Sequence, residues 1–130
     1  MTPTTTPRPT DAELAILRVI WKLGSATVRE IHDELLREQP GTGYTTVLKL
    51  LQIMTDKGLV VRDESQRAHV YAPSESAQST QRRLVRDLVD RAFDGSATAL
   101  VMQALSAKKA SPEELAEIRA LLETIEGERR

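Results

Sequence analysis

The chain has 130 residues, of which 40% are hydrophobic, and its 18 basic and 19 acidic side chains leave a formal net charge of −1. It contains no cysteine, which excludes disulfides, thiolate metal sites and thiol catalysis. His32 and His69 do not have a metal-ligand spacing, no apolar run approaches the roughly 20 residues that span a bilayer, and no hydrophobic signal segment follows Met1. We therefore expect a soluble, cytoplasmic protein with no metal ion, no cofactor and no catalytic residues.

The chain opens with a polar, proline-rich segment, residues 1–9, which we expect to be a disordered tail. A first helix should follow at once, because Thr10 and Glu13 have the spacing of a capping box. Apolar residues then recur at helical intervals up to Trp21, and Gly24 is a natural C-terminal stop. These signals predict a helix from about Thr10 that ends near Gly24.

Two further helices are expected before the pattern changes. The second opens with another capping-box pair, Thr27 and Glu30, and ends before the breaker sequence at 39–41, Gln-Pro-Gly. The third runs from about residue 44 to residue 57, with Gly58 as its C-cap. It has an apolar face and an opposite polar face, in each of which residues recur at three- and four-residue steps. The apolar face holds Val47, Leu50, Leu51 and Met54, and the polar face holds Thr45, Lys49, Gln52 and Asp56.

After the third helix the spacing of the apolar residues changes to the one typical of β-strands. Residues 59–62 predict a strand, residues 63–66 a turn, and residues 68–71 a returning strand that ends at Pro73. Three short helices followed by a hairpin is the element order of a winged helix-turn-helix, which we place at residues 10–73.

The rest of the chain is helical again, with helices expected over about 75–93 and 97–105 and after Ser111, which forms a third capping-box pair with Glu114. A three-helix piece of this size, residues 74–127, has too little surface to bury alone. We therefore expect its apolar faces to meet a second copy of the chain, with an intramolecular core as the alternative. The residues expected in this dimer interface are Leu84, Leu88, Phe93, Leu100, Val101, Leu105 and Leu122. The expected fold class is mainly α with a small β-hairpin wing: a winged helix-turn-helix plus a C-terminal three-helix dimerisation unit.

The polar face of the third helix is suited to reading DNA, because a helix fits the major groove, where base edges can be told apart. Its first turn should approach the DNA first. The hydroxyls of Thr45 and Thr46, and the free backbone N–H groups beside them, suit phosphates or base edges. Lys49 and Gln52 continue this face with donors for guanine or phosphate and for adenine. Each could instead be ordinary solvated surface, and the two threonines could serve as helix caps.

Three more residues complete the expected DNA-binding set. Arg67 lies at the expected wing, where a guanidinium can reach a phosphate or the minor groove. Arg62, on the flanking strand, is a weaker candidate. Tyr44 could contact a phosphate, although packing at the helix start is its more ordinary role. The near-neutral net charge does not exclude DNA, since phosphate contact needs only a local basic surface. Residues 39–62 carry three basic residues, Lys49, Lys57 and Arg62, against one acidic residue.

Over roughly residues 10–125 the chain resembles the penicillinase and methicillin-resistance repressor family (BlaI/MecI/CopY type). The most specific segments are Tyr44-Thr45-Thr46-Val47 and Lys57-Gly58-Leu59-Val60. The resemblance implies a homodimer, held by its C-terminal helices, that places two winged helices on a short inverted-repeat operator and represses transcription by occluding the promoter. It also implies that Leu48 enters the major groove with Thr45, Thr46 and Lys49. Being apolar, Leu48 would contact a thymine methyl.

Two departures from this family concern its inducing signals. Members that a membrane sensor-protease inactivates are cut at an Asn-Phe bond, and the matching positions here are Gln103-Ala104. This puts a sensor-protease partner, and derepression by that route, in doubt. The copper-responsive branch carries paired cysteines, which this chain lacks.

Two other classes of function are alternatives to a repressor. A winged helix can also be a protein-protein interaction module that touches no DNA, and the near-neutral charge favours that alternative. An enzyme is disfavoured, because the acidic residues are scattered or lie at helix caps and no nucleophile-base pair is present.

Overall fold

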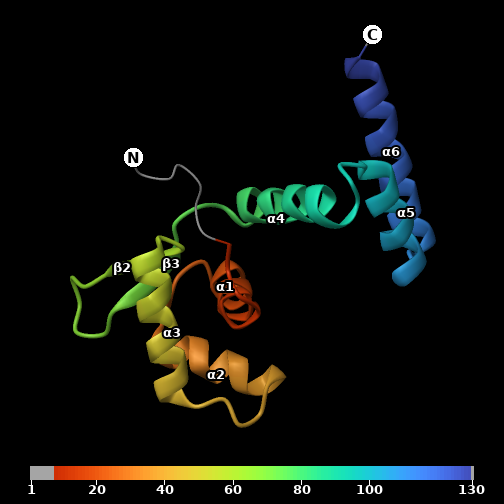
Figure 1. Cartoon of the computed structure of the whole chain (residues 1–130). Helices are drawn as coiled ribbons and strands as arrows, with labels where there is room; N and C mark the ends of the chain where they lie inside the picture. The colour runs from red at the N-terminus through yellow and green to blue at the C-terminus, as the bar shows by residue number, and fades with distance from the viewer. Residues whose placement is uncertain (1–7, 130) are drawn as a thin grey trace. The chain divides into compact units, whose positions relative to one another are not determined.

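The computed structural model describes residues 8–129 and is mainly helical with one small sheet (Figure 1). The elements are α1 (Asp11–Leu23), β1 (Ala26–Thr27), α2 (Val28–Glu38), α3 (Tyr44–Lys57), β2 (Val60–Asp63), β3 (Val70–Pro73), α4 (Ala77–Ala92), α5 (Ala97–Ala107) and α6 (Pro112–Glu128). This confirms the expected fold class of three helices with a wing, followed by three more helices. Of the expected N-terminal tail, residues 1–7 lie outside the described residues, and Pro9 is buried.

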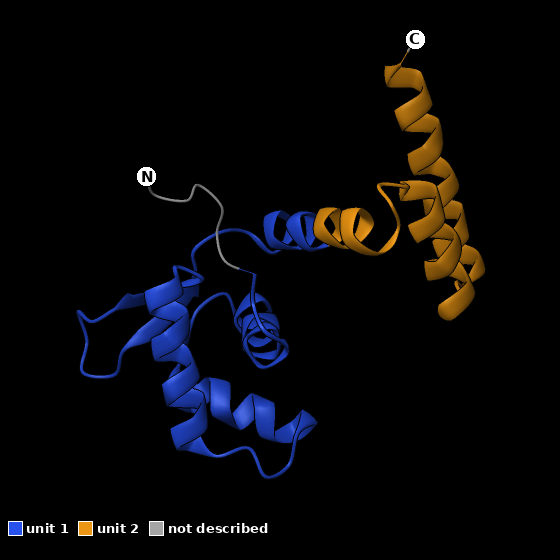
Figure 2. Cartoon of the chain, viewed as in Figure 1, with its two compact units in different colours: residues 1–84 blue, residues 85–130 orange. Residues whose placement is uncertain are grey.

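The chain divides between Leu84 and Val85, within α4, into two compact units (Figure 2). The sequence placed this division about ten residues earlier, at the end of the hairpin. The first unit holds α1–α3, the sheet and the start of α4. The second holds the rest of α4 with α5 and α6.

All three capping boxes expected from the sequence are present. In each, a hydroxyl accepts a hydrogen bond from the backbone N–H three residues on, and the glutamate there accepts one from the cap residue. The pairs are Thr10 with Glu13, Thr27 with Glu30, and Ser111 with Glu114. These short-range signals fix where α1, α2 and α6 begin.

The sheet has three antiparallel strands in the order β1-β3-β2, one more than the expected hairpin. The additional strand, β1, has only two residues, too few for a period to be visible in the sequence. Ala26 lies opposite Tyr71 and Thr27 opposite Val70. This pairing ties the first turn of α2 to the start of β3, and so to the loop that precedes β3.

The two strands of the hairpin begin one and two residues later than the sequence pattern indicated. Gly58 ends α3 in the left-handed conformation, with φ of 82°. The next residue, Leu59, still donates its backbone N–H to the carbonyl of Met54 at 2.9 Å, so it belongs to the helix cap and not to the strand. Ala68 and His69 likewise remain in the loop between β2 and β3.

The core of the first unit lies between the three helices and the sheet. Trp21 and Leu50 pack against it but are only partly buried. Its buried apolar residues are Ile16, Leu17, Val19, Ile20, Ala26, Val28, Ile31, Leu35, Val47, Leu51, Met54, Leu59, Val60 and Tyr71. With Tyr71 the only aromatic residue among them, branched aliphatic side chains supply most of this core.

A buried ion pair joins the start of α1 to the end of α3. Glu13 is 2% exposed, and its carboxylate accepts a hydrogen bond from the Lys57 ammonium at 2.7 Å while completing the cap at Thr10. Desolvation acts to raise the pKa of this carboxyl. The hydrogen bonds and charge supplied by Lys57 and Thr10 outweigh it, so the pKa of Glu13 lies below its ordinary value. One side chain thus serves two junctions of the fold.

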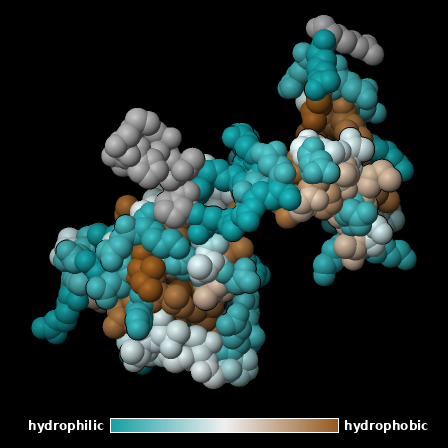
Figure 3. Space-filling model, in the orientation of Figure 1, coloured by the Kyte–Doolittle hydropathy of each residue, from teal (hydrophilic) through white to brown (hydrophobic). Residues whose placement is uncertain are grey.

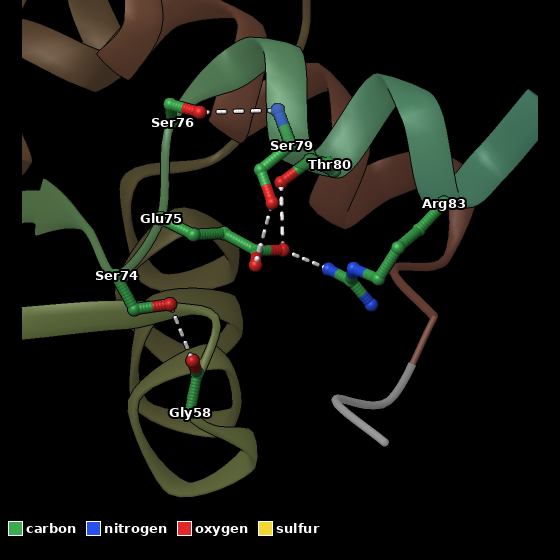
Figure 4. Close-up of polar contacts among 7 residues, drawn as sticks. All are labelled: Gly58, Ser74, Glu75, Ser76, Ser79, Thr80 and Arg83. Atoms are coloured by element: carbon green, nitrogen blue, oxygen red, sulfur yellow. Dashed lines mark hydrogen bonds and ion pairs between the residues drawn. The ribbon is translucent and has the colours of Figure 1, made fainter. Parts of the chain in front are cut away.

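A second polar cluster fixes the start of α4 (Figure 4). The hydroxyl of Ser74 donates to the carbonyl of Gly58 at 2.6 Å, and the Glu75 carboxylate accepts from Thr80 at 3.0 Å and from Arg83. Burial opposes ionisation of Glu75, but these donors prevail and hold its pKa below the ordinary value. The Ser74 bond ties the residue before Glu75 to the end of α3, and the Glu75 bonds reach the first turns of α4, which belong to the first unit.

Candidate nucleic-acid interface

The third helix is held on one side and open on the other. Val47, Leu51 and Met54 are fully buried. On the opposite side every residue of the expected reading face is exposed, including the large apolar side chains of Tyr44 and Leu48, which are 47% and 42% exposed. The exposed residues of this face are Tyr44, Thr45, Thr46, Leu48, Lys49 and Gln52. A rigid helix with such a face can present side chains to a partner without rearranging.

The first turn of α3 has no side-chain cap. Its N-cap residue is Gly43, and no side chain accepts a hydrogen bond from the first-turn amides. The sequence left open that Thr45 and Thr46 serve as helix caps. They do not, because the helix already begins at Tyr44 and both lie inside its first turn. The amides therefore keep their capacity to bind an anion, as expected of a helix N-terminus that meets a phosphate.

A groove of about 440 Å³ lies against this face of α3. Three segments far apart in the sequence form it: the start of α2, the start of α3, and the loop between β2 and β3, which we call the wing loop. Its lining residues are Thr27, Val28, Arg29, Tyr44, Leu48, Arg67, Ala68, His69 and Tyr71. The pairing of β1 with β3 explains the geometry, because it sets Thr27 opposite Val70 and so brings α2 beside the wing loop.

The groove and the adjoining helix face carry free positive charge. Arg29 and Arg67 line the groove, and Lys49 is exposed on the same helix as Tyr44 and Leu48. None of the three cations forms an ion pair with any residue between 8 and 129. An unpaired guanidinium beside a concave surface is suited to a phosphate, which it can bind in two-pronged fashion.

The other basic residues that the sequence analysis counted are occupied elsewhere. Lys57 is paired with Glu13, and the Arg62 guanidinium lies 3.0 Å from the Glu64 carboxylate. A hydrogen bond with Tyr71, aided by the charge of Glu64, raises the pKa of Arg62 above its ordinary value. The structure therefore brings Tyr44, Leu48 and Arg67 together at the groove but does not bring Arg62 there. The local positive charge comes from α2, α3 and the wing loop.

Arg29 and His69 line the groove, although the sequence pattern did not place either of them in the expected DNA-binding set. A weak signal existed for Arg29: it lies in the first turn of α2, where a basic residue opposes the helix dipole and an acidic residue is the stabilising choice. For His69 the sequence held no such signal, since its place in the groove depends on the wing loop folding back beside α2.

The second unit exposes four of the apolar residues expected at a dimer interface, Leu88, Val101, Leu105 and Leu122. No residue of α5 or α6 is buried. Leu88 is 48% exposed and Leu122 is 53% exposed, while Phe93 and Leu100 are partly covered. Leu84, also partly covered, is the last residue of the first unit. Figure 3 shows hydrophobic residues at the surface of this unit. Its large exposed apolar side chains are Val85, Leu88, Val101, Met102, Leu105, Leu121, Leu122 and Ile125.

From residue 8 to residue 129, no three His, Asp or Glu side chains gather closely enough to bind a metal ion. None of the helices described is both long and apolar enough to traverse a bilayer. Gln103 and Ala104 lie on the exposed surface of α5.

Comparison with known proteins finds similarity to penicillinase repressors. A family model described as penicillinase repressor matches residues 9–124. A penicillinase repressor of Bacillus licheniformis is 28% identical over 120 residues, 90% of this chain and 91% of that protein. A transcriptional regulator BlaI of Mycobacterium tuberculosis is 34% identical over 85 residues, 65% of this chain and 61% of that protein.

The fold agrees with these sequence matches. A solution structure of the DNA-binding domain of the repressor BlaI has a TM-score of 0.51 and 28% identity, over 58% of this chain and 90% of that one. The family match spans both units of the structure and includes the exposed face of α3, the groove and the apolar surface of α4–α6. The chain belongs to the penicillinase repressor family.

Proposed function

We propose that the protein is a DNA-binding transcriptional repressor that acts as a homodimer on an inverted-repeat operator. The observation that carries this proposal is the groove beside α3, in which Arg29 and Arg67, both without an acidic partner among the described residues, flank an exposed helix face. Membership of the penicillinase repressor family supports it. Occupation of the operator would block transcription by steric exclusion, so the role needs no catalytic step.

In this proposal α3 contacts the bases of the operator, and the groove contacts its phosphates. α3 enters the major groove, where Lys49 and Gln52 donate to base edges and Leu48 contacts a thymine methyl. One phosphodiester strand follows the groove between α3 and the wing loop, where Arg29 and Arg67 neutralise its charge. Phosphate contacts of this kind fix the register of the protein on the duplex, and base contacts supply the sequence preference.

The second unit supplies the dimer. Its exposed leucines, valines and Met102 supply apolar side chains on the surface, and a contiguous exposed apolar patch is typical of a protein-protein interface. Pairing of this surface with that of a second copy gives a two-fold assembly with two copies of α3, which matches the symmetry of an inverted repeat. A membrane sensor-protease as partner stays a prediction of the family resemblance.

Replacing Arg67 or Lys49 with alanine is expected to weaken operator binding about five- to tenfold. Operator duplexes are first selected from a random-sequence pool with the wild-type protein, and dissociation constants are then measured at several salt concentrations. The Arg67→Ala variant should also lower the slope of log affinity against log salt by about one, because one phosphate contact is lost.

Arg18→Ala is the matched control, since Arg18 is exposed on α1, outside the groove, and the same charge is removed. It should bind like the wild type. Equal affinity of Arg67→Ala and Lys49→Ala to the wild type would eliminate the proposed reading face. A wild-type protein that binds neither selected nor random duplex at low salt would favour the protein-protein interaction module instead.

Gly43→Asp is expected to stabilise folding while weakening DNA binding. The carboxylate would cap the uncapped first turn of α3, and relative to glycine this adds about 0.3 kcal/mol to the free energy of unfolding. It would also place a negative charge where a phosphate is proposed to bind. Urea unfolding and gel-shift titration measure the two effects, with Gly43→Ser as a neutral cap for comparison. An aspartate variant that binds DNA as tightly as the serine variant would exclude a phosphate at this turn.

A further inference from the structure

His32 is a polar residue of α2 that faces the turn before α3. Its Nε2 lies 2.7 Å from the carbonyl oxygen of Thr42, and because a carbonyl can only accept, Nε2 must carry the proton. Its ring also meets the ring of Tyr44 edge to face, with centroids 5.6 Å apart and planes at 86°. One side chain of α2 therefore contacts residues on both sides of Gly43, the N-cap of α3.

The turn that His32 contacts has a defined shape of its own. Gly41 adopts a left-handed conformation, with φ of 95°. The backbone N–H and the hydroxyl of Thr42 both donate to the carbonyl of Gln39, at 3.2 and 2.7 Å. These bonds use the two donors of Thr42, and His32 holds its acceptor. Movement of the turn against α2 would have to break the bond to His32.

We propose that His32 is a positioning residue for DNA recognition, which holds the start of α3 in its binding geometry. The inference rests on the proposed function, since it concerns the same helix face. His32 does not line the groove, whereas Tyr44 does. No side chain caps the first turn of α3. The contacts of His32 with Thr42 and Tyr44 restrain the start of the helix instead, and they leave the first-turn amides able to bind a phosphate.

The test separates the two contacts of His32. His32→Ala removes both, His32→Gln keeps an amide donor without the ring, and His32→Phe keeps a ring without the donor. We expect His32→Ala to lower affinity for the selected operator about tenfold, and each of the other two about threefold. The salt slope should stay at the wild-type value in all three, because no phosphate contact is removed.

Two further measurements distinguish positioning from general loss of stability. Amide hydrogen exchange in the first turn of α3 should accelerate in His32→Ala, while exchange in the core of α1 changes only with global stability. Val19→Ala serves as the control: Val19 is buried in α1, and its truncation destabilises the domain away from the turn. Its affinity for the operator should match that of the wild type under conditions where both are folded.

Three results would overturn the inference. His32→Ala could bind within twofold of the wild type; its salt slope could fall by about one, which would make His32 a direct phosphate contact; or Val19→Ala could lose as much affinity. Failure of the proposed function has a different signature, because then the wild type itself binds no duplex. The exchange measurement needs no DNA and still reports whether His32 orders the first turn of α3.

Discussion

Replacing Leu88 with aspartate is expected to convert the protein from a dimer into a monomer and to lower its affinity for a full operator by about 10²–10⁴-fold. Leu88 is 48% exposed on α4 in the second unit, which also exposes Val85 and Val101. A carboxylate there would have to be desolvated when two copies meet. The free energy that this desolvation costs is far larger than the free energy gained by burying a leucine. Light scattering gives the oligomeric state, and titration of a two-half-site duplex gives the affinity.

The size of this effect comes from effective concentration and not from a lost DNA contact. When one winged helix of a dimer is bound, the other is held near the second half-site, and this advantage disappears in a monomer. Affinity for a single half-site should therefore be nearly unchanged in Leu88→Asp. Gln103→Asp introduces the same charge at an exposed polar position of α5 and should leave the dimer intact. A Leu88→Asp protein that remains dimeric, or a wild type that is monomeric at micromolar concentration, would contradict the proposed interface.

Replacing Glu13 with alanine is expected to lower the free energy of unfolding by about 3 kcal/mol, the largest change in stability that we expect of a single substitution here. The carboxylate caps α1 at Thr10 and pairs with Lys57 at the end of α3. Its removal leaves the Lys57 side chain, which is only 26% exposed, without its partner, and the capping hydrogen bond is lost as well. Urea unfolding at neutral pH, followed by circular dichroism, measures the change.

Two companion variants separate the contributions of Glu13. Glu13→Gln keeps a capping group and should cost less than Glu13→Ala. A double variant with methionine at positions 13 and 57 should recover much of the ion-pair part, because replacing both members of a buried pair is far less costly than removing one. If the double variant is less stable than Glu13→Ala, the ion pair makes a net contribution to stability, beyond compensating for the burial of its two charges.

The lowered pKa of Glu13 also predicts how stability depends on pH. A carboxyl whose pKa is lower in the folded protein than in the unfolded chain stabilises the fold at any pH above its ordinary pKa, which is near 4.5. That stabilisation is lost as the pH falls from the ordinary pKa through the lower pKa of the folded protein. Wild-type stability should therefore fall across this acidic window more steeply than that of Glu13→Gln. Parallel acid-dependent losses in the two proteins would show that Glu13 is not the group responsible.

The sequence alone determined most of the local structure. The capping pairs, the glycines at helix ends and the apolar periods depend on residues only a few positions apart, so they can be recognised without knowing the fold. This is why α3 was correctly bounded at Tyr44 and Lys57, and why its buried and exposed faces were separated. The start of β2 was misplaced because the cap of α3 extends through Leu59, which a pattern of apolar residues cannot distinguish from a strand.

Only the tertiary structure decided which charges are available and where the groove lies. Lys57 and Arg62 contribute to a local basic surface in the sequence, but Glu13, 44 positions away from Lys57, and Glu64 pair with them. Arg29 and Arg67 are 38 positions apart, and the two-residue strand β1 brings them to one groove by pairing with β3. Such assignments depend on contacts between distant segments, and the periodicity of a single segment contains no information about them.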